Sequence, residues 1–402
     1  MRDQPRAAQM GEVTLMGRSR RSFLQALGGV AALPVARALP GWAGPLDEAA
    51  APGGRSLQRE GGRKIGYGIV GLGRISMGQF MPGVRISQHS RITALVSGHR
   101  DKAEKAADQY GVPHSSIYNY ENYGDIGHNP EVDAVYIALP NSMHAEYTIR
   151  GAQAGKHVLC EKPMATSSAD CERMIGACRQ AQRKLMIAYR CQLEPTNLKA
   201  IELVRNGYTG QLQVMEAAFG FNIGAGEWRL NKKMAGGGPL VDVGIYCLQA
   251  CRYITGEEPA EVSAQWSVID HDGRFNEVEE NLSWMMRFPS GVLASCHTSY
   301  GANSGDGYRA FGSKGWVGLD PAFVYEGLHL RGGSQGGEAI DQPANDPAPH
   351  QFMREADHFA QCILENREPK TPGEEGLRDQ RLIEAIYQSC REGRPVKTVT
   401  SG

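Results

Sequence analysis

One short segment constrains the fold of this chain more than any other: an apolar run that ends in two closely spaced glycines. The run from Lys64 to Val70 has the character of a buried strand, and Gly71-Leu72-Gly73 follows it directly. The first glycine permits a tight turn, and the second lets the backbone approach a pyrophosphate at the start of the next helix. Ser76 stands where a third glycine is usual, which helix–strand packing can tolerate. The segment therefore predicts a dinucleotide-binding turn whose candidate residues are Gly71, Gly73, Arg74 and Ile75.

From this turn to residue 188, short apolar segments alternate with amphipathic ones. We expect strands at 65–70, 92–96, 134–139, 157–160 and 184–188, and helices at 102–110, 145–154 and 168–181. Such alternation is typical of a parallel sheet that helices cover on both faces. The sequence therefore predicts a doubly wound α/β Rossmann domain over residues 64–188.

Beyond residue 188 the strands become longer and less regularly separated by helices. We expect a helix at 197–205, strands at 213–221, 261–269, 281–288, 292–300 and 308–312, and terminal helices at 350–365 and 377–391. Pro289-Ser290-Gly291 would join two of these strands as a hairpin. The pattern predicts an α+β C-terminal domain over residues 189–402, with a large, mostly antiparallel, open-faced sheet.

Trp284, Met285 and Met286 stand side by side in one of these strands, so apolar side chains point to both faces of the sheet. One face of an antiparallel sheet can be solvated, but apolar residues on both faces suggest that both are covered. We therefore expect this domain to bind substrate and also to form a homo-oligomer, either a dimer or a tetramer.

The first 63 residues carry an export pattern. Ser19-Arg20-Arg21-Ser22-Phe23-Leu24 precedes an apolar run at 26–35, and Ala36-Arg37-Ala38 gives the small-x-small pattern that a signal peptidase accepts. A membrane anchor is the alternative, but the run is shorter than the roughly 20 residues that span a bilayer. We expect a twin-arginine signal peptide at 1–38, a flexible arm at 39–63, and export of the folded protein to the periplasm.

Composition excludes several other classes of protein. Lys and Arg number 43 and Asp and Glu 44, so the net charge of −1 offers no electrostatic attraction for nucleic acid or an anionic membrane. The nine cysteines lack CxxC or His-rich ligand spacing, which favours buried thiols over a zinc site or disulfides. We expect small-molecule partners, and no nucleic acid, membrane or metal.

The end of the second predicted strand bears on the choice of dinucleotide. An NAD site normally has Asp or Glu there to bind the ribose 2′-hydroxyl. Here Val96 is followed by Ser97-Gly98-His99-Arg100-Asp101-Lys102, with no acid at the strand end. Ser97 can donate a hydrogen bond to a 2′-phosphate, and Lys102 can neutralise it. This pattern predicts NADP, although an ordinary solvated helix start is the alternative.

Three polar motifs follow at places where a doubly wound sheet binds ligands or beside glycine-rich turns. Pro140-Asn141-Ser142-Met143-His144 and Glu161-Lys162-Pro163 come after predicted strands, and Tyr246 stands four residues after Asp242, on one helical face. A solvated lysine and a histidine that caps the next helix are the alternatives. The candidate cofactor-binding residues here are Leu139, Asn141, His144, Glu161 and Lys162.

These motifs carry a resemblance to a known family. From about residue 64 to residue 397 the chain resembles the Gfo/Idh/MocA oxidoreductases, and it is most similar to the glucose–fructose and aldose–aldose oxidoreductases among them. Many members of the wider family have His where Tyr246 stands. By resemblance alone, Tyr120 would lie by the adenine, and Arg190, Trp228 and Arg229 near the cofactor or the sugar. The similar segments include 96–98, 139–146, 160–166, 189–191, 228–230, 235–238, 242–246 and 372–376.

The resemblance implies an enzyme that keeps NADP tightly bound. It would oxidise an aldose at C1 to the lactone and then reduce a second sugar, a ketose or an aldose, to the polyol in a ping-pong cycle. Export fits this activity, because there is no soluble nicotinamide pool outside the cytoplasm and the cofactor must be regenerated in place. An ordinary NADP-dependent sugar dehydrogenase and, less favoured, a non-catalytic sugar-binding protein are the alternatives.

Three residues are the catalytic candidates. Oxidation at C1 removes a proton from the anomeric hydroxyl while a hydride moves to the nicotinamide. Tyr246 would carry the proton, Lys162 would stabilise its phenolate, and Asp242 would orient the pair or bind sugar hydroxyls. The reverse assignment, with Lys162 as the proton carrier and Tyr246 as a binding group, remains open.

Overall fold

A computed structural model describes residues 62–302 and 305–398 of the chain. The signal peptide expected at 1–38 and nearly all of the arm expected at 39–63 therefore lie outside the described residues. Within the described residues, no helix is both long and apolar enough to cross a membrane.

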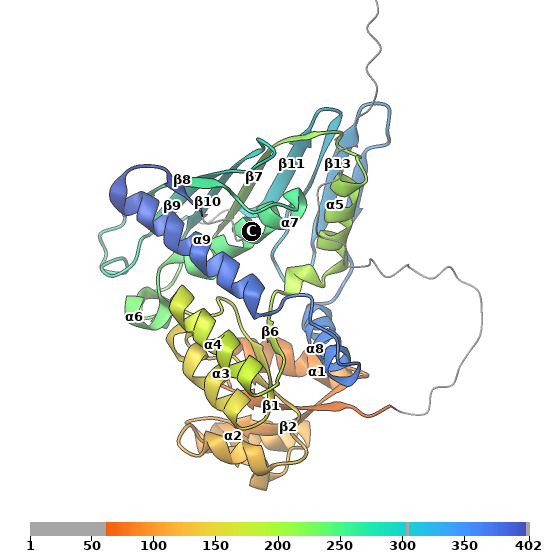
Figure 1. Ribbon diagram of the computed structural model, residues 1–402, viewed down its shortest axis with the longest axis vertical. Coiled ribbons are helices and arrows are strands. Elements are labelled where there is room, and N and C mark those ends of the chain that lie inside the picture. Colours follow the sequence, from red (N-terminus) through yellow and green to blue (C-terminus); the bar gives the residue numbers. More distant parts are fainter. Residues whose placement is uncertain (1–61, 303–304, 399–402) are drawn as a thin grey trace, which may run out of the picture. The chain divides into compact units, whose positions relative to one another are not determined.

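Six parallel strands form the first sheet, in the order β3-β2-β1-β4-β5-β6 (Figure 1). This is the strand order of a doubly wound dinucleotide-binding fold, in which ligands bind where the order reverses, between β1 and β4. Every residue of β1 is buried, as expected for a parallel strand with both faces covered. The strands are β1 (Ile65–Val70), β2 (Ser90–Val96), β3 (Ile117–Tyr118), β4 (Ala134–Ile137), β5 (His157–Cys160) and β6 (Leu185–Ile187).

Helices connect these strands, and α4 begins at a side-chain cap. The Ser167 hydroxyl accepts the N–H of Asp170 at 3.2 Å and so starts α4. One helix of this layer comes from far along the chain: α8 packs against α1, and the Tyr67 hydroxyl donates to Ala356 O at 2.8 Å. The helices are α1 (Met81–Ile86, after the π-helical turn η1, Ser76–Phe80), α2 (Arg100–Tyr110), α3 (His144–Gln153), α4 (Ser168–Gln180) and α8 (Pro349–Leu364).

Nine strands form the second sheet, in the order β14-β13-β12-β11-β7-β10-β9-β8-β15. Neighbouring strands are antiparallel except β7 and β10, which run parallel. The strands are β7 (Leu212–Gly220), β8 (Glu261–Ser267), β9 (Asn281–Arg287), β10 (Leu293–Ser299), β11 (Asp306–Gly312), β12 (Gly315–Leu319), β13 (His329–Ser334), β14 (Ile340–Pro343) and β15 (Val396–Lys397).

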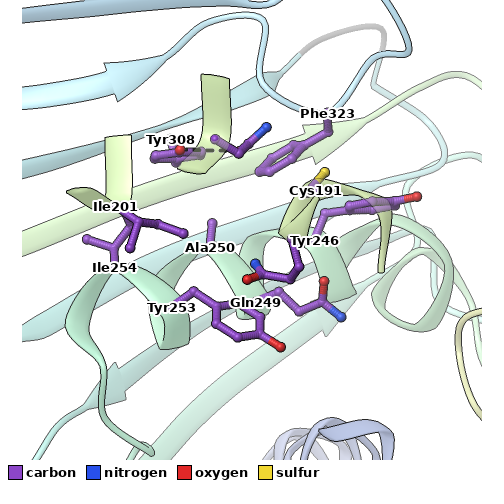
Figure 2. A pocket seen from close by; sticks show the side chains of 11 residues that line it. Cys191, Ile201, Tyr246, Gln249, Ala250, Tyr253, Ile254, Tyr308 and Phe323 are labelled. Carbon is purple, nitrogen blue, oxygen red and sulfur yellow. Dashed lines mark hydrogen bonds between the residues drawn. The ribbon is translucent and has the colours of Figure 1, made fainter. Parts of the chain in front are cut away.

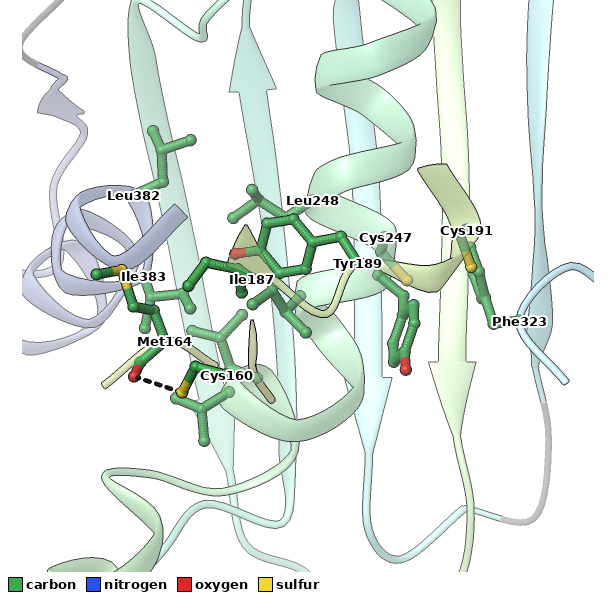
Figure 3. Packing of buried hydrophobic residues seen from close by; sticks show 14 of the residues in the cluster. Cys160, Met164, Ile187, Tyr189, Cys191, Cys247, Leu248, Phe323, Leu382 and Ile383 are labelled. Carbon is green, nitrogen blue, oxygen red and sulfur yellow. Dashed lines mark hydrogen bonds between the residues drawn. The ribbon is translucent and has the colours of Figure 1, made fainter. Parts of the chain in front are cut away.

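Helices α5 (Pro195–Arg205), α7 (Ile245–Thr255) and α9 (Gly373–Glu392) cover one face of this sheet (Figure 1). The alternation in β9 buries Trp284 and Met286 beneath them and leaves Met285 exposed on the other face. Figure 3 shows part of the core, where Leu248 of α7, Ile383 of α9 and Ile187 of β6 lie in one apolar cluster. The packing of the second sheet thus continues into the first.

The structure confirms the predicted fold class: a Rossmann-type parallel sheet followed by a domain with a mostly antiparallel sheet. The strands β12 to β15 were not predicted. Gly315 and Gly318 in β12, and Gly332 and Gly333 in β13, lower the strand propensity of those segments. The last two strands are too short, at 4 and 2 residues, to show a period.

We propose that the face of the second sheet that none of the described helices covers packs against a second copy of the chain. Val214, Met285 and Leu293 are exposed there on adjacent strands, and Leu293 pairs directly with Val214. An exposed apolar patch on an otherwise folded surface commonly marks an interface.

In light scattering at micromolar concentration we expect a dimer or a tetramer, and Met285→Glu should give a smaller species because a charge would enter the interface. Leu364→Glu is the control, since Leu364 is 43% exposed, against 48% for Met285, but lies at the end of α8. A monomeric native chain would contradict the proposal.

Candidate functional site

The glycine turn after β1 leaves its backbone open to a ligand. Gly71 has a φ of +93°, and a Cβ at this position would lie 2.5 Å from Ala138 O, so the turn requires glycine. Among the described residues, and apart from the two chain neighbours of Gly73, no atom lies within 4 Å of where its Cβ would be. The Ser76 hydroxyl donates to Gly71 O at 2.6 Å and so closes the turn where a third glycine is usual. The open backbone at this sheet edge fits the pyrophosphate of a nicotinamide dinucleotide.

The next two residues of the turn have different surroundings. Ile75 is partly buried against the core of the first sheet. Arg74 is largely exposed and forms an ion pair with Glu227. Because Glu227 directly precedes the η6 turn (Trp228–Leu230), this pair joins the glycine turn to the segment that carries Trp228 and Arg229.

Ser97, Lys102 and Tyr120 lie around the end of β2. Ser97 is buried, and its hydroxyl accepts the N–H of His99 at 3.1 Å. Tyr120 lies against Gly98, where a Cβ would meet the ring at 3.2 Å. Lys102 is exposed in the first turn of α2. The structure therefore brings Tyr120 beside this strand end and leaves the Lys102 ammonium in solvent.

Two residues after β4 tie neighbouring loops together. Asn141 Nδ2 donates to Ala235 O, at the end of the short helix α6 (Lys232–Ala235), at 2.8 Å. Both ring nitrogens of His144 lie 2.9 Å from carbonyl oxygens, those of Pro163 and Leu139. Burial lowers the pKa of His144, so the neutral ring donates to one carbonyl at a time. His144 thus connects the loops after β4 and β5, and both its nitrogens face protein.

The centre of the site is an ion pair between Lys162, after β5, and Asp242, in the π-helical turn η7 (Leu240–Gly244). Lys162 Nζ donates to the Asp242 carbonyl at 2.7 Å and to Oδ1 at 3.3 Å. On Oδ2, the Tyr300 hydroxyl donates at 2.8 Å and Arg229 Nε lies at 3.0 Å. Burial alone would raise the pKa of Asp242, but Lys162, Arg229 and Tyr300 lower it to about 2. Asp242 is therefore ionised and held in place at neutral pH.

Tyr246, in the first turn of α7, faces two cations. Lys162 Nζ and Arg190 Cζ each lie 4.9 Å from the centroid of its ring. Burial raises the pKa of Tyr246 above its ordinary value, and Arg190 opposes that rise. The phenol is therefore protonated at neutral pH. The sequence pointed to Lys162 as the cation that favours the phenolate. Here its ammonium also binds Asp242, and Arg190 is a second cation at the same distance from the ring.

Glu161 precedes Lys162 but points elsewhere. Its carboxylate accepts the Tyr136 hydroxyl at 2.6 Å and the backbone N–H of Lys162 at 3.2 Å. Leu139 is buried next to the glycine turn, where its side chain would meet a Cβ on Gly71 at 2.8 Å. The side chains of Glu161 and Leu139 thus contact other protein groups at the carboxyl edge of the first sheet.

Sequence reasoning missed three residues that hold this centre: Tyr300, Glu227 and Gln351, which accepts Arg190 Nη1 at 2.6 Å. Tyr300 binds Asp242, which lies 58 positions earlier, and no spacing pattern connects such distant positions. The available signal was slight: Tyr300 is an aromatic hydroxyl at the end of a predicted strand.

A small cavity borders Tyr246 on the side of the second sheet (Figure 2). Its volume of about 10 Å³ is roughly the space for one water molecule. Its lining includes the largely apolar side chains of Cys191, Ile201, Tyr308 and Phe323. This cavity is too small for a sugar.

Two family models match the chain in succession. The one described as "Oxidoreductase family, NAD-binding Rossmann fold" covers residues 65–189, and the one described as "GFO/IDH/MocA C-terminal domain" covers residues 197–318. A D-xylose 1-dehydrogenase (NADP(+)) from Haloarcula marismortui is 32% identical over 342 residues, which are 83% of this chain and 93% of the relative.

Two solved structures are also similar. An aldose–aldose oxidoreductase from Caulobacter crescentus, complexed with glycerol, is 48% identical with a TM-score of 0.80, covering 83% of this chain and 100% of that chain. A 3-ketoreductase from Actinomadura kijaniata, in complex with NADP and TDP-benzene, is 25% identical with a TM-score of 0.72, covering 81% and 98%. These matches confirm the resemblance drawn from the motifs: this chain belongs to the Gfo/Idh/MocA family of NAD(P)-dependent oxidoreductases.

Proposed function

We propose that the protein is an NADP-dependent sugar oxidoreductase that retains its cofactor, oxidises an aldose at C1 and reduces a second sugar. The observation that carries this proposal is the meeting of Lys162, Asp242 and Tyr246 at the carboxyl edge of the first sheet. The 48% identical aldose–aldose oxidoreductase supports a reaction between two sugars. Export to the periplasm, proposed from Arg20 and Arg21, would also require the cofactor to be regenerated in place.

The residues of the chain divide the work between binding and proton transfer. A nicotinamide bound at this edge supplies the acceptor and donor of hydride. Asp242 Oδ1 can accept a further hydrogen bond from a sugar hydroxyl besides that of Lys162. Tyr246 donates its proton to the carbonyl oxygen of the sugar that is reduced. In the oxidation its phenolate, favoured by Arg190, takes the proton of the anomeric hydroxyl.

Two alternatives to this proposal are each supported by a specific observation. Lys162 is hydrogen-bonded to Asp242 and lies over the Tyr246 ring, so it can be the proton carrier, with Tyr246 binding the sugar. The D-xylose 1-dehydrogenase relative favours an ordinary dehydrogenase that releases its cofactor.

The proposed preference for NADP can be tested at the end of β2. Lys102→Ala should weaken NADP binding roughly tenfold and leave NAD binding unchanged, because a charged hydrogen bond contributes about 1.5–3 kcal/mol when fully formed. Ser97→Asp should shift preference toward NAD by charge repulsion. Titration of nucleotide-free protein with each dinucleotide measures both effects. Lys105→Ala, exposed one turn further along α2, is the control. Unchanged discrimination in both variants would overturn the assignment.

A retained cofactor predicts a particular kinetic pattern. Purified protein should keep its nucleotide through gel filtration, as seen by absorbance and fluorescence. Varying both sugars should give parallel double-reciprocal lines, since the first product leaves before the second sugar binds. Intersecting lines together with a requirement for added NADP would favour the ordinary dehydrogenase.

The assignment of the proton carrier predicts the effect of Tyr246→Phe. Loss of the hydroxyl should slow both half-reactions by a factor on the order of 10²–10⁴. Absorbance of the bound cofactor after mixing with aldose alone measures the first half-reaction. Tyr308→Phe is the control, because Tyr308 borders the same cavity but donates to Asn197. A Tyr246→Phe protein that reduces its cofactor at the normal rate would make Lys162 the carrier.

A further inference from the structure

Glu355, on α8, is a buried carboxyl group without a hydrogen-bond partner. It is 0% exposed, and neither of its oxygens has a partner among the described residues. An isolated ionised carboxylate costs far more to bury than a neutral acid. Burial raises the pKa of Glu355, repulsion from Glu161 raises it further, and Arg190 acts in the opposite direction. The site chemistry described above gives this residue no role.

Glu355 lies on the helix that holds Arg190. Gln351, one turn earlier on α8, accepts Arg190 Nη1 at 2.6 Å, and Arg190 Nε is also buried without a partner. The same guanidinium lies 4.9 Å from the centroid of the Tyr246 ring. Arg190 is therefore the group through which α8 can influence Tyr246.

A second carboxyl group, Glu161, shares this environment. Burial raises its pKa too, and it accepts the Tyr136 hydroxyl at 2.6 Å. The charge of Glu355 also raises the pKa of Tyr67, Tyr136 and Cys191. Burial raises the pKa of all three, so they stay neutral at neutral pH. Lys162 also lowers the pKa of Glu161, and the Arg190 guanidinium lies 4.7 Å from the centroid of the Tyr325 ring as well. Arg190 is nevertheless the cation that opposes the raised pKa of both Glu355 and Tyr246.

We propose that Glu355 is a positioning residue for proton transfer at Tyr246 and that it acts as a neutral acid. While Glu355 is protonated, Glu161 is the nearby carboxyl group that can be ionised, and Arg190 keeps its effect on the phenol. Ionisation of Glu355 would place a second negative charge beside Arg190 and make the Tyr246 phenolate harder to form. The oxidative half-reaction would then decline at alkaline pH. This inference rests on the proposed role of Tyr246.

Glu355→Gln tests the inference because glutamine has the shape of the protonated acid and cannot ionise. The measurement is the rate of cofactor reduction after mixing loaded protein with aldose, from pH 6 to pH 10. At alkaline pH the rate of the native protein should fall. The rate of Glu355→Gln should not fall, and that of Glu355→Asp should fall as in the native protein. Asp357→Asn is the control: Asp357 is a half-buried acid on the same helix, and its carboxylate accepts the Ser90 hydroxyl at 3.2 Å. It should keep the native profile.

Thermal unfolding gives a readout that does not depend on activity. A carboxyl group whose pKa is raised by folding destabilises the fold once the pH exceeds its unfolded pKa, near ~4.3. The unfolding midpoint of Glu355→Gln should therefore exceed that of the native protein by an amount that grows as the pH rises from about 4 to 7.

The outcomes separate the two proposals. Two results would overturn the role of Glu355. In one, the rate of cofactor reduction by Glu355→Gln falls at alkaline pH as it does in the native protein. In the other, Glu355→Gln loses this rate at every pH while its fold stays intact. If Tyr246→Phe also reduces its cofactor normally, the proposed function fails as well.

Discussion

The ion pair between Lys162 and Asp242 connects the two sheets at the place where chemistry is expected. Lys162 is positioned by the end of β5 and Asp242 by the η7 turn, so the pair forms only when the C-terminal segment lies over the carboxyl edge of the first sheet. Arg229 and Tyr300 complete the set of donors on the same carboxylate. Because these contacts lower the pKa of Asp242 to about 2, they stabilise the fold above the unfolded pKa near ~3.9, and the contribution is lost as the pH falls from there toward 2.

Other contacts fix the same segment to the same edge. Arg74 pairs with Glu227, Asn141 donates to Ala235 O, and Gly236 packs so closely on Thr166 that a Cβ would lie 2.9 Å from its methyl group. These contacts reach the loops after β1, β4 and β5 respectively. The exposed Arg74–Glu227 pair should contribute least, since exposed ion pairs contribute about 0–1 kcal/mol. The segment around residues 227–236 is thus attached most weakly at the glycine turn.

Local physics accounts for what the sequence could predict. The apolar run of β1 and the positive φ required at Gly71 are short-range properties, so the strand and its turn could be placed from the sequence. The family resemblance predicted that Lys162, Asp242 and Tyr246 belong to one site. The parallel pairing of β7 with β10 and the bond from Tyr300 to Asp242 join distant segments, and no local period encodes them. The position of a second cation, Arg190, over the Tyr246 ring followed only from three-dimensional packing.

The electrostatics of the site limit which group can act as the base. With a pKa of about 2, Asp242 is a poor proton acceptor for a sugar hydroxyl, although it lies at the centre of the site. If Tyr246 carries the proton as proposed, oxidation requires a cation that stabilises its phenolate, whereas reduction uses the resting phenol directly. Arg190 and Lys162 lie equally near the Tyr246 ring, but Lys162 is also hydrogen-bonded to Asp242, and Arg190 is the cation that lowers the pKa of Tyr246. In the proposed reaction Asp242 is a fixed anion that orients the substrate. Tyr246 is a buried phenol whose ionisation is favoured by the guanidinium of Arg190. Any change in the charge beside Arg190 should therefore affect oxidation more than reduction.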